Sequence, residues 1–305
     1  MNFRTPTIAQ VVLCTFLVLA AAVRPGTAQD QPQSSISFTF TSFDYPGATS
    51  TAGCGINKTG IIAGSYRDTS GVQHGFVRLA NGTFEELNYP GSVSTSLCHI
   101  NDSNQIAGYY VDSSNVAHGL LFSAPNHFTS LDYPGATQTE AYGINDSGQM
   151  TGAWFNSAGE TSGFSLLSGT YTDIVYPGSV STAASDVNSA GLISGNWGNT
   201  GANSQSYGFL LTSALNGTYS QVDYPGATRT LILGINDSNQ VVGMYSDASN
   251  VTHGWGGVPA KNEFITIDYP GSTGCQVAGI TNAGHLAGSY TDTSGVTHGF
   301  LAVPK

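Results

Sequence analysis

Tyr45-Pro46-Gly47 is the first of six copies of one tripeptide, and the spacing of these copies decides the fold. The other copies begin at Tyr89, Tyr133, Tyr176, Tyr224 and Tyr269, so the steps are 44, 44, 43, 48 and 45 residues. A regular period of this length is typical of proteins that repeat one supersecondary unit. The chain is therefore predicted to contain six equivalent units, which we number one to six in chain order.

Each unit is predicted to contain four short strands, A to D. In unit three, strand A covers residues 139–145, a turn follows at 146–148, and strand B covers 149–155. In unit one, a second turn at 68–71 precedes strand C, and strand D covers 83–89. Asp and Ser in these turns bond back to the backbone and Gly accepts positive φ, so the pattern favours antiparallel hairpins.

Four strands per unit, a period near 44 and many glycine-bearing turns match the blade of a β-propeller. The predicted fold is all-β, a six-bladed β-propeller with four antiparallel strands per blade. Unit six stops after strand C at residues 303–305, whereas residues 36–44 precede the first Tyr-Pro-Gly as a strand D would. This N-terminal strand is predicted to complete the last blade, which would close the ring and remove two open edges.

The first residues of the chain resemble a secretory signal peptide. Arg4 supplies a positive n-region, an apolar stretch runs from Ile8 to Val23, and Gly26-Thr27-Ala28 offers a cleavage site. The predicted division is a leader at 1–28, a short linker at 29–35 and the propeller at 36–305. The protein is thus expected to be exported, to the periplasm or beyond the cell. A retained membrane anchor is the alternative, and no other segment of the sequence could span a bilayer.

Charge limits the partners that the protein is expected to bind. The predicted mature chain keeps six basic residues against nineteen acidic ones, a net charge of −13. Such a surface repels nucleic acid and anionic lipid. Charged residues make up only 9% of the chain, so neutral ligands, either glycans or peptides, suit this surface better than phosphates do.

Two motifs recur besides Tyr-Pro-Gly. Gly-Ile-Asn begins at Gly55, Gly143 and Gly234 on strand A, and His-Gly-Phe begins at His74 and His298 on strand C. Together they resemble the extracellular repeat family named for its His-Ala-Phe signature, over about nine tenths of the chain. The departures are Gly for the middle Ala, Leu120 and Trp255 for Phe, and Ser162 and Tyr207 for His. The resemblance implies the fold and export and adds no activity.

Four histidines share one repeat position, and each follows an aspartate by six residues. The pairs are Asp68 with His74, Asp112 with His118, Asp247 with His253, and Asp292 with His298. A repeat position spaces side chains around a ring, whereas zinc needs ligands that converge. We therefore expect each pair to bond within its own unit, and we predict no metal site.

The aspartates of these pairs, with Asn156 and Asn199 in units three and four, also suggest a ring of calcium ligands. Asx turns explain them more simply. The Asn-Asp-Ser turns lack the alternating acids and closing Glu of a calcium loop. No cofactor is predicted, and calcium stays as the alternative.

One aromatic residue per unit lies two positions before that Asp or Asn. The six are Tyr66, Tyr110, Trp154, Trp197, Tyr245 and Tyr290. Rings at one level of a propeller could stack on sugar faces, or they could pack between units. Because the two Trp fall in adjacent units, Tyr110, Trp154 and Trp197 are the candidate ligand-binding aromatics.

Strand A is expected to be innermost, and differences between units there are informative. His99 and Asp186 replace a glycine that the other four units share, which makes them the catalytic candidates. Glu140, Tyr142 and Arg229 add polar groups nearby and are candidate ligand-binding residues. These groups could form a ligand site or an acid/base site, and neutral drift in a tolerant channel is the alternative.

The predicted mature chain keeps three cysteines, Cys54, Cys98 and Cys275. An odd number in an exported protein permits at most one intrachain bridge. Cys54 and Cys98 fall at the same level of adjacent units, so a bridge between them and a buried reduced state both stay open.

Together these features favour an exported binding module for neutral polar ligands, glycan or peptide, at the propeller mouth. The alternative function is a polysaccharide lyase or hydrolase that uses His99 and Asp186 across the channel. No Gly-x-Ser-x-Gly, His-Glu-x-x-His or Walker motif supports an enzyme. A structural protein of the cell envelope is a third possibility.

Overall fold

The computed structural model describes residues 36–199 and 205–305, so the predicted leader at 1–28 and linker at 29–35 lie outside the described residues. Within these ranges the chain forms twenty-four strands and one 3-10 helix, Pro259–Lys261. None of the helical structure described is long and apolar enough to cross a membrane.

The strands follow the repeat. Unit one contains β2 (Ser50–Ile56), β3 (Ile62–Arg67), β4 (Gln73–Arg78) and β5 (Phe84–Glu86). Unit two contains β6 (Ser94–Ile100), β7 (Ile106–Val111), β8 (Ala117–Ser123) and β9 (His127–Leu131). Unit three contains β10 (Gln138–Ile144), β11 (Met150–Phe155), β12 (Thr161–Leu167) and β13 (Thr170–Ile174). Unit four contains β14 (Ser181–Val187), β15 (Ile193–Gly198), β16 (Ser206–Leu211) and β17 (Tyr219–Val222). Unit five contains β18 (Arg229–Ile235), β19 (Val241–Ser246), β20 (Thr252–Val258) and β21 (Glu263–Thr266). Unit six contains β22 (Gly274–Ile280), β23 (Leu286–Thr291) and β24 (Thr297–Pro304).

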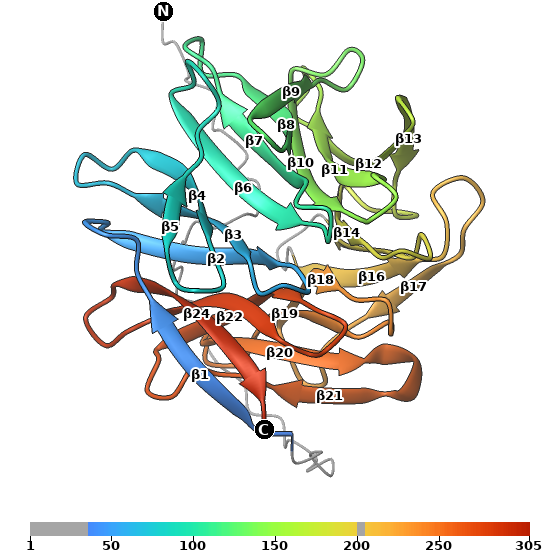
Figure 1. The fold of residues 1–305 in the computed structure, drawn as a ribbon. Helices are drawn as coiled ribbons and strands as arrows, with labels where there is room; N and C mark the ends of the chain where they lie inside the picture. Colours follow the sequence, from blue (N-terminus) through green and yellow to red (C-terminus); the bar gives the residue numbers. More distant parts are fainter. Residues whose placement is uncertain (1–35, 200–204) are drawn as a thin grey trace, which may run out of the picture.

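These strands build antiparallel sheets that pack face to face. Four sheets have four strands each, and β10–β13 and β14–β17 share one eight-stranded sheet. A single parallel bridge, Thr161 with Ser181, joins the two halves of that sheet. The first strand of each unit contacts the first strand of the next, and β22 contacts β2 (Figure 1). The predicted all-β propeller arrangement with antiparallel blades is confirmed.

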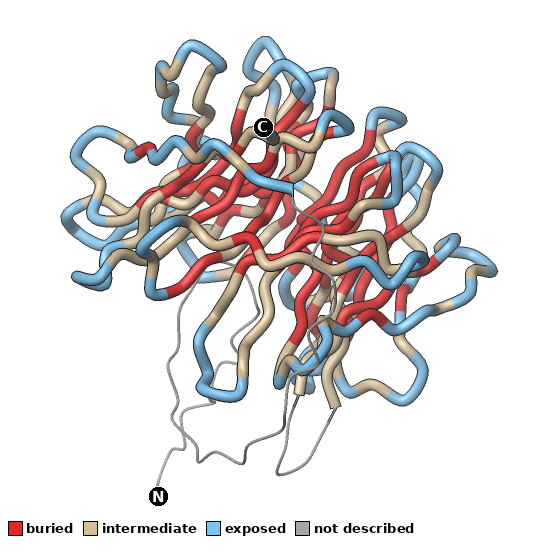
Figure 2. The backbone as a smooth tube through the Cα atoms, turned by 90° about the horizontal axis from the view of Figure 1, so that it is seen from below, coloured by how far each residue is buried: buried red, intermediate tan, exposed pale blue. Residues whose placement is uncertain are grey.

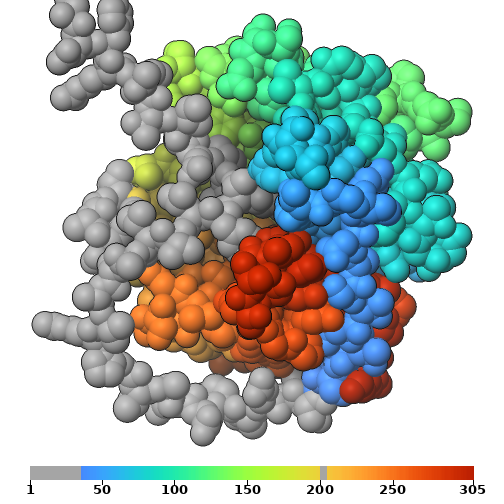
Figure 3. Space-filling model, turned by 90° about the vertical axis from the view of Figure 1, so that its left-hand side faces the viewer, coloured from blue at the N-terminus to red at the C-terminus, as the bar shows by residue number. Residues whose placement is uncertain are grey.

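The two ends of the described chain meet. β1 (Phe38–Phe43) pairs antiparallel with β24, from Phe38 with Pro304 to Phe43 with Gly299. The N–H of Lys305 donates to the carbonyl of Ser37 at 2.9 Å. Figure 3 shows the same adjacency on the surface, where atoms from the start of the described chain lie against those from its end. β1 is thus the fourth strand of the sheet that contains β22, β23 and β24.

Each Tyr-Pro-Gly forms a type II turn. In unit one, the N–H of Ala48 donates to the carbonyl of Tyr45 at 3.1 Å, and Gly47 has φ +78°. A type II turn needs positive φ at its third residue and favours Pro at its second, which explains the tripeptide. The N–H of Tyr45 donates to the Thr51 hydroxyl at 3.0 Å, and the next four units repeat this bond with their own Thr.

The core lies between the sheets rather than in one central mass. The third residue of each His-Gly-Phe position is fully buried: Phe76, Leu120, Phe164, Phe209, Trp255 and Phe300 are each 0% exposed. Figure 2 shows that the middles of the strands are buried and the turns at both ends are exposed. A Cβ on Gly75 would lie 2.5 Å from the Leu87 carbonyl and 2.8 Å from Leu97 Cγ. Close packing against its own strand D and against the next unit therefore favours Gly at this position of unit one.

The three cysteines are buried thiols, and no disulfide joins any of them in the described chain. Cys275 occupies the position of the turn threonine in unit six, and its thiol donates to the Ile267 carbonyl at 3.4 Å. Burial raises the pKa of Cys275 to about 12. Of the two alternatives that the sequence left open, the structure supports the buried reduced state.

Candidate functional site

One mouth of the central channel is built from the turns between strands A and B, and in units one to five an asparagine organises this turn. The Asn57 side-chain oxygen accepts from the N–H groups of Thr59 and Ile61, both at 3.1 Å. Its amide nitrogen donates to the Asn101 carbonyl of the next unit at 3.4 Å. Asn101, Asn145, Asn188 and Asn236 donate to the following unit in the same way. We call this end of the channel the asparagine mouth.

Carboxylates at the asparagine mouth also join neighbouring units. Asp102 accepts from the N–H of Lys58 at 2.9 Å, Asp146 from that of Asp102 at 2.8 Å, and Asp237 from that of Ser189 at 2.8 Å. Lys58 Nζ lies 3.4 Å from Asp102 Oδ2. These acids therefore serve the scaffold, as Asx turns do, and this rim is net negative.

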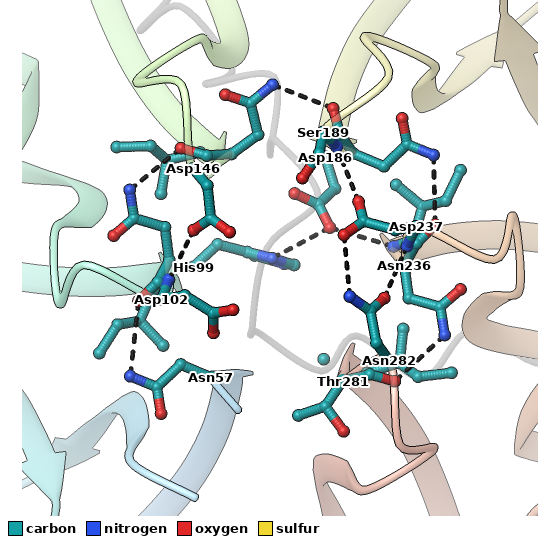
Figure 4. Close-up of a pocket in the computed structure, with 18 of the residues that line it drawn as sticks. Asn57, His99, Asp102, Asp146, Asp186, Ser189, Asn236, Asp237, Thr281 and Asn282 are labelled. Atoms are coloured by element: carbon teal, nitrogen blue, oxygen red, sulfur yellow. Dashed lines mark hydrogen bonds and ion pairs between the residues drawn. The ribbon is translucent and has the colours of Figure 1, made fainter. Parts of the chain in front are cut away.

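His99 and Asp186 meet inside the asparagine mouth. His99 comes from β6 and Asp186 from β14, and Nδ1 of the imidazole lies 3.2 Å from Asp186 Oδ2 (Figure 4). The two side chains are only 13% and 8% exposed. Asp186 also accepts from the N–H of Ile235 at 3.0 Å, so the pair ties units two, four and five together.

The His99 imidazole carries a proton more readily than a free histidine. Burial works to lower the pKa of His99, but the Asp186 charge and hydrogen bond, with a further hydrogen bond to the Leu233 backbone, raise it overall. The imidazole therefore has two partners that favour its protonation, the Asp186 side chain and the Leu233 backbone.

Two buried hydroxyls beside Asp186 are features that the sequence analysis missed. Thr151 and Ser194 are both 0% exposed, and neither hydroxyl has a hydrogen-bond partner among the described residues. Ser194 is in register with Asp186. A Cβ on Gly143 would lie 2.5 Å from the Thr151 hydroxyl and 2.8 Å from Asp186 Oδ1, so both surround that glycine. The sequence did contain a signal for these two hydroxyls. At the position of Thr151 and Ser194 on strand B, the other four units have Ala or Val.

The space around this cluster is small. The cavity at the asparagine mouth, lined by His99 and Asp186 among others, has a volume of about 90 Å³. Liquid water occupies about 30 Å³ per molecule, and sites for small-molecule ligands span roughly 300–1,000 Å³. The cavity is thus smaller than a typical small-molecule site.

The remaining channel candidates lie elsewhere along strand A. Arg229 is the first residue of β18, six positions before Ile235, and it does not line the cavity at the asparagine mouth. Glu140 and Tyr142 do not line it either, and they form their own buried pair, in which the Tyr142 hydroxyl donates to Glu140 at 2.6 Å. Of these candidates His99 lines the cavity, whereas Arg229, Glu140 and Tyr142 do not, because successive positions on strand A lie at different depths of the channel.

Glu140 makes stability depend on pH. Burial raises the pKa of Glu140 from 4.5 to about 7, against a smaller lowering by the Tyr142 hydrogen bond. A carboxyl with a raised pKa stabilises the fold fully below its unfolded pKa, and this contribution is lost as pH rises through the folded value. We expect the free energy of unfolding to fall by about 3 kcal/mol between pH 4.5 and pH 8 because of this group.

Urea unfolding of the wild type and of Glu140→Gln at several pH values measures this effect. The amide stays neutral, so the variant should show a flatter profile over the same range. Identical profiles for the two proteins would contradict the prediction.

At the opposite edge of the sheets, the six strand B aromatics are parts of stacks. We call this edge, with the Tyr-Pro-Gly turns and the turns between strands B and C, the Tyr-Pro-Gly face. In unit one, Tyr66 stacks on Tyr45 with centroids 3.8 Å apart and on His74 with centroids 5.0 Å apart. The equivalent triples are Tyr89, Tyr110 and His118; Tyr176, Trp197 and Tyr207; Tyr224, Tyr245 and His253; and Tyr269, Tyr290 and His298.

These stacks correct the prediction for two of the three candidate aromatics. Tyr110 lies between Tyr89 and His118, and Trp197 between Tyr176 and Tyr207. Neither can offer a ring face to a sugar, because both faces are covered. Trp154 differs, since Tyr133 covers only one of its faces, with centroids 4.5 Å apart.

The repeated histidines behave as expected within their units. His74 Nε2 lies 3.4 Å from Asp68 Oδ2, and the corresponding distances for His118, His253 and His298 are 3.6, 3.6 and 3.4 Å. Each histidine also has a second partner, which the sequence analysis missed, just before the next Tyr-Pro-Gly. These partners are Asn88, Asp132, Asp268 and Asp44. Across 36–199 and 205–305, no three His, Cys, Asp or Glu side chains group as metal ligands would.

Comparisons with known proteins bear on the fold. No protein-family model and no curated protein sequence matches the chain. A mutant of AofleA from Arthrobotrys oligospora matches with TM-score 0.54 at 10% identity, over 90% of each chain. A mutant Aleuria aurantia lectin in complex with Fucα1-6GlcNAc matches with TM-score 0.52 at 10% identity, over 83% of this chain and 91% of that one. TolB from Acinetobacter baumannii matches with TM-score 0.53 at 11% identity, over 80% of this chain and 63% of that one. What these proteins share with the chain is the propeller fold.

Proposed function

We propose that the protein is an exported glycan-binding module whose site lies on the Tyr-Pro-Gly face. The observation that carries the proposal is the cluster around Asp173. The Trp154 indole N–H donates to Asp173 Oδ1 at 3.0 Å, and the Tyr133 hydroxyl donates to the same oxygen at 2.8 Å. An aromatic ring fixed beside an exposed carboxylate offers a surface for the apolar face of a sugar and an acceptor for its hydroxyls.

Charge and similarity support a neutral glycan. The chain has few charged residues and an acidic balance, which disfavours anionic ligands. Two of the similar propellers are proteins from Arthrobotrys oligospora and Aleuria aurantia, and the second is a lectin in complex with a fucosylated sugar. This supports glycan over peptide as the class of ligand.

A glycan array tests the proposal. Wild-type protein should bind at least one neutral glycan, and Trp154→Ala should reduce that binding about tenfold or more, as removal of an aromatic anchor typically does. Trp197→Ala is the matched control, because both faces of Trp197 are covered. No glycan bound above background by the wild type, or binding of a peptide library alone, would refute the proposal.

We propose further that the six units form one ring of six blades, with β1 as the outer strand of the last. The pairing of β1 with β24 and the contacts of β2 with β22, β23 and β24 support this closure. The eight-stranded sheet then represents two blades, since its halves share a single parallel bridge.

Export and family membership complete the proposal. The n-region at Arg4 and the apolar stretch from Ile8 to Val23 support a cleaved leader. The Gly-Ile-Asn and His-Gly-Phe motifs support a divergent member of the His-Ala-Phe repeat family. Amino-terminal sequencing of the protein recovered outside the cytoplasm should begin near Gln29.

A second candidate function is acid/base chemistry at the asparagine mouth. The contact of His99 with Asp186, beside the buried hydroxyls of Thr151 and Ser194, favours it. His99 would donate a proton and Asp186 would orient the ring. Turnover on a polysaccharide panel that survives His99→Ala and Asp186→Ala would eliminate this role, and the small cavity makes the glycan-binding face the better supported site.

A further inference from the structure

Unit three breaks the stack of three rings that the other five units share. Ser162 stands in register with Trp154, where other units place an imidazole or a phenol. Among the described residues no second ring stacks on Trp154, which Tyr133 covers from one side. In unit three the third member of the stack is therefore replaced by a small hydroxyl.

The partner of that missing ring is replaced as well. Val175 occupies the position just before Tyr-Pro-Gly where other units place a polar acceptor. These acceptors are Asn88, Asp132, Asp223, Asp268 and Asp44. Val175 is 52% exposed. Both members of the histidine-to-carboxylate pair are thus absent from one unit, and an apolar side chain stands where the carboxylate would be.

The other units show what size of group fits there. In unit one the His74 imidazole stacks on Tyr66 with centroids 5.0 Å apart and planes 21° apart. Unit three has the same strand register, so the position above Trp154 suits a flat ring of similar size. We call this position the unit-three slot, defined by Trp154, Ser162, Val175 and Asp173.

The edge of the unit-three slot is polar and acidic. Asp173 is exposed, and although one oxygen accepts from Trp154 and Tyr133, a carboxylate has about four acceptor positions. Glu160 is also exposed and is held by the Asn156 amide at 2.7 Å. An apolar ring face bordered by acceptors matches a pyranose, which has C–H groups on one face and hydroxyl donors around its edge.

We propose that the unit-three slot binds a single neutral pyranose residue stacked on the free face of the Trp154 indole. The inference rests on the proposed glycan-binding function and narrows it to one subsite per chain. The carboxylates of Asp173 and Glu160 disfavour uronic and sialic acids by like-charge repulsion.

Giving unit three the histidine and aspartate that other units have should fill the unit-three slot. The double variant Ser162→His, Val175→Asp gives unit three the pair found in units two, five and six. Its imidazole should cover Trp154 and reduce binding of the best array glycan about tenfold or more. Trp154 fluorescence provides a second measurement, since Trp255 is fully buried and both faces of Trp197 are covered. Ligand should change the emission of the wild type and not that of the double variant.

Opening unit one should create a second slot. Tyr66 donates to Glu86 there, as Trp154 donates to Asp173, so the variant His74→Ser, Asn88→Val reproduces the arrangement of unit three. Titration calorimetry should give one site per chain for the wild type and two for this variant.

The outcomes separate the two proposals. If wild-type protein binds no glycan, the proposed function and the slot both fail. If it binds a glycan with one site and Ser162→His, Val175→Asp binds it equally well, the slot is wrong while the function stands. Stronger binding of uronic or sialic acids than of neutral sugars would also overturn the slot.

Discussion

Deletion of residues 36–44 is expected to prevent the chain from folding into a stable, soluble molecule. These residues include all of β1, which makes six register pairs with β24. Phe43 is 7% exposed and Phe40 packs edge-on to Phe300 with centroids 5.6 Å apart. Loss of one buried Phe side chain costs about 3–5 kcal/mol, and a domain has only about 5–15 kcal/mol in total. The deletion should therefore abolish cooperative thermal unfolding and expose the edge of β24 to aggregation.

Single substitutions in β1 test the same prediction through measurable losses in the free energy of unfolding. Phe43→Ala should lower the free energy of unfolding by about 3–5 kcal/mol, and Phe38→Ala by less, because Phe38 is only half-buried. A synthetic peptide of residues 36–44 added during refolding should restore part of the soluble fraction. A deletion variant that unfolds at the wild-type temperature would show that the last sheet does not need β1, and the proposed closure of the ring would fail.

Separating His99 from Asp186 is the second change with a large expected effect. His99→Gly leaves the buried Asp186 carboxylate with the Ile235 N–H as a hydrogen-bond donor and removes the imidazole. Breaking a buried ion pair by removing one partner typically costs about 3–5 kcal/mol. Asp186→Gly should cost less, because the imidazole left behind can lose its proton and become neutral.

The sequences of the other units provide a control variant for these single substitutions. Four units have glycine at this position, so His99→Gly combined with Asp186→Gly reproduces their sequence. We expect the double variant to lie much closer to the wild type in urea unfolding than the sum of the single changes predicts. The wild type should also lose stability as pH rises through the raised pKa of His99, since that contribution is complete only below the unfolded value. Additive losses and an unchanged pH profile would show that the two side chains are not coupled.

Local chemistry was predictable from the sequence. The Tyr-Pro-Gly turns, the Asx turns at Asp68 and Asn57, and the bond from His74 to Asp68 all join residues within a few positions of each other. Because such contacts depend on backbone geometry that the residues themselves favour, a repeated pattern identifies them.

Contacts between distant residues were not predictable in the same way. The sequence left open whether the six rings stack on a ligand or pack between units. Stacking on the Tyr of Tyr-Pro-Gly joins residues 21 positions apart, as for Tyr45 and Tyr66. The second partner of His74, Asn88, lies 14 positions away. Only the pairing of strands B, C and D brings these groups together, and it is this pairing that distinguishes Trp154 from the other five aromatics.

The sequence by itself determined the period, the hairpins within each unit and the residue types at each turn, because these follow from local backbone preferences repeated along the chain. The tertiary structure decided which ring faces are covered, and it decided that His99 contacts Asp186 while Arg229 lies apart from both. The physical reason is that those contacts join different strands or different units, so their distances depend on how sheets pack around a channel and not on spacing in the chain.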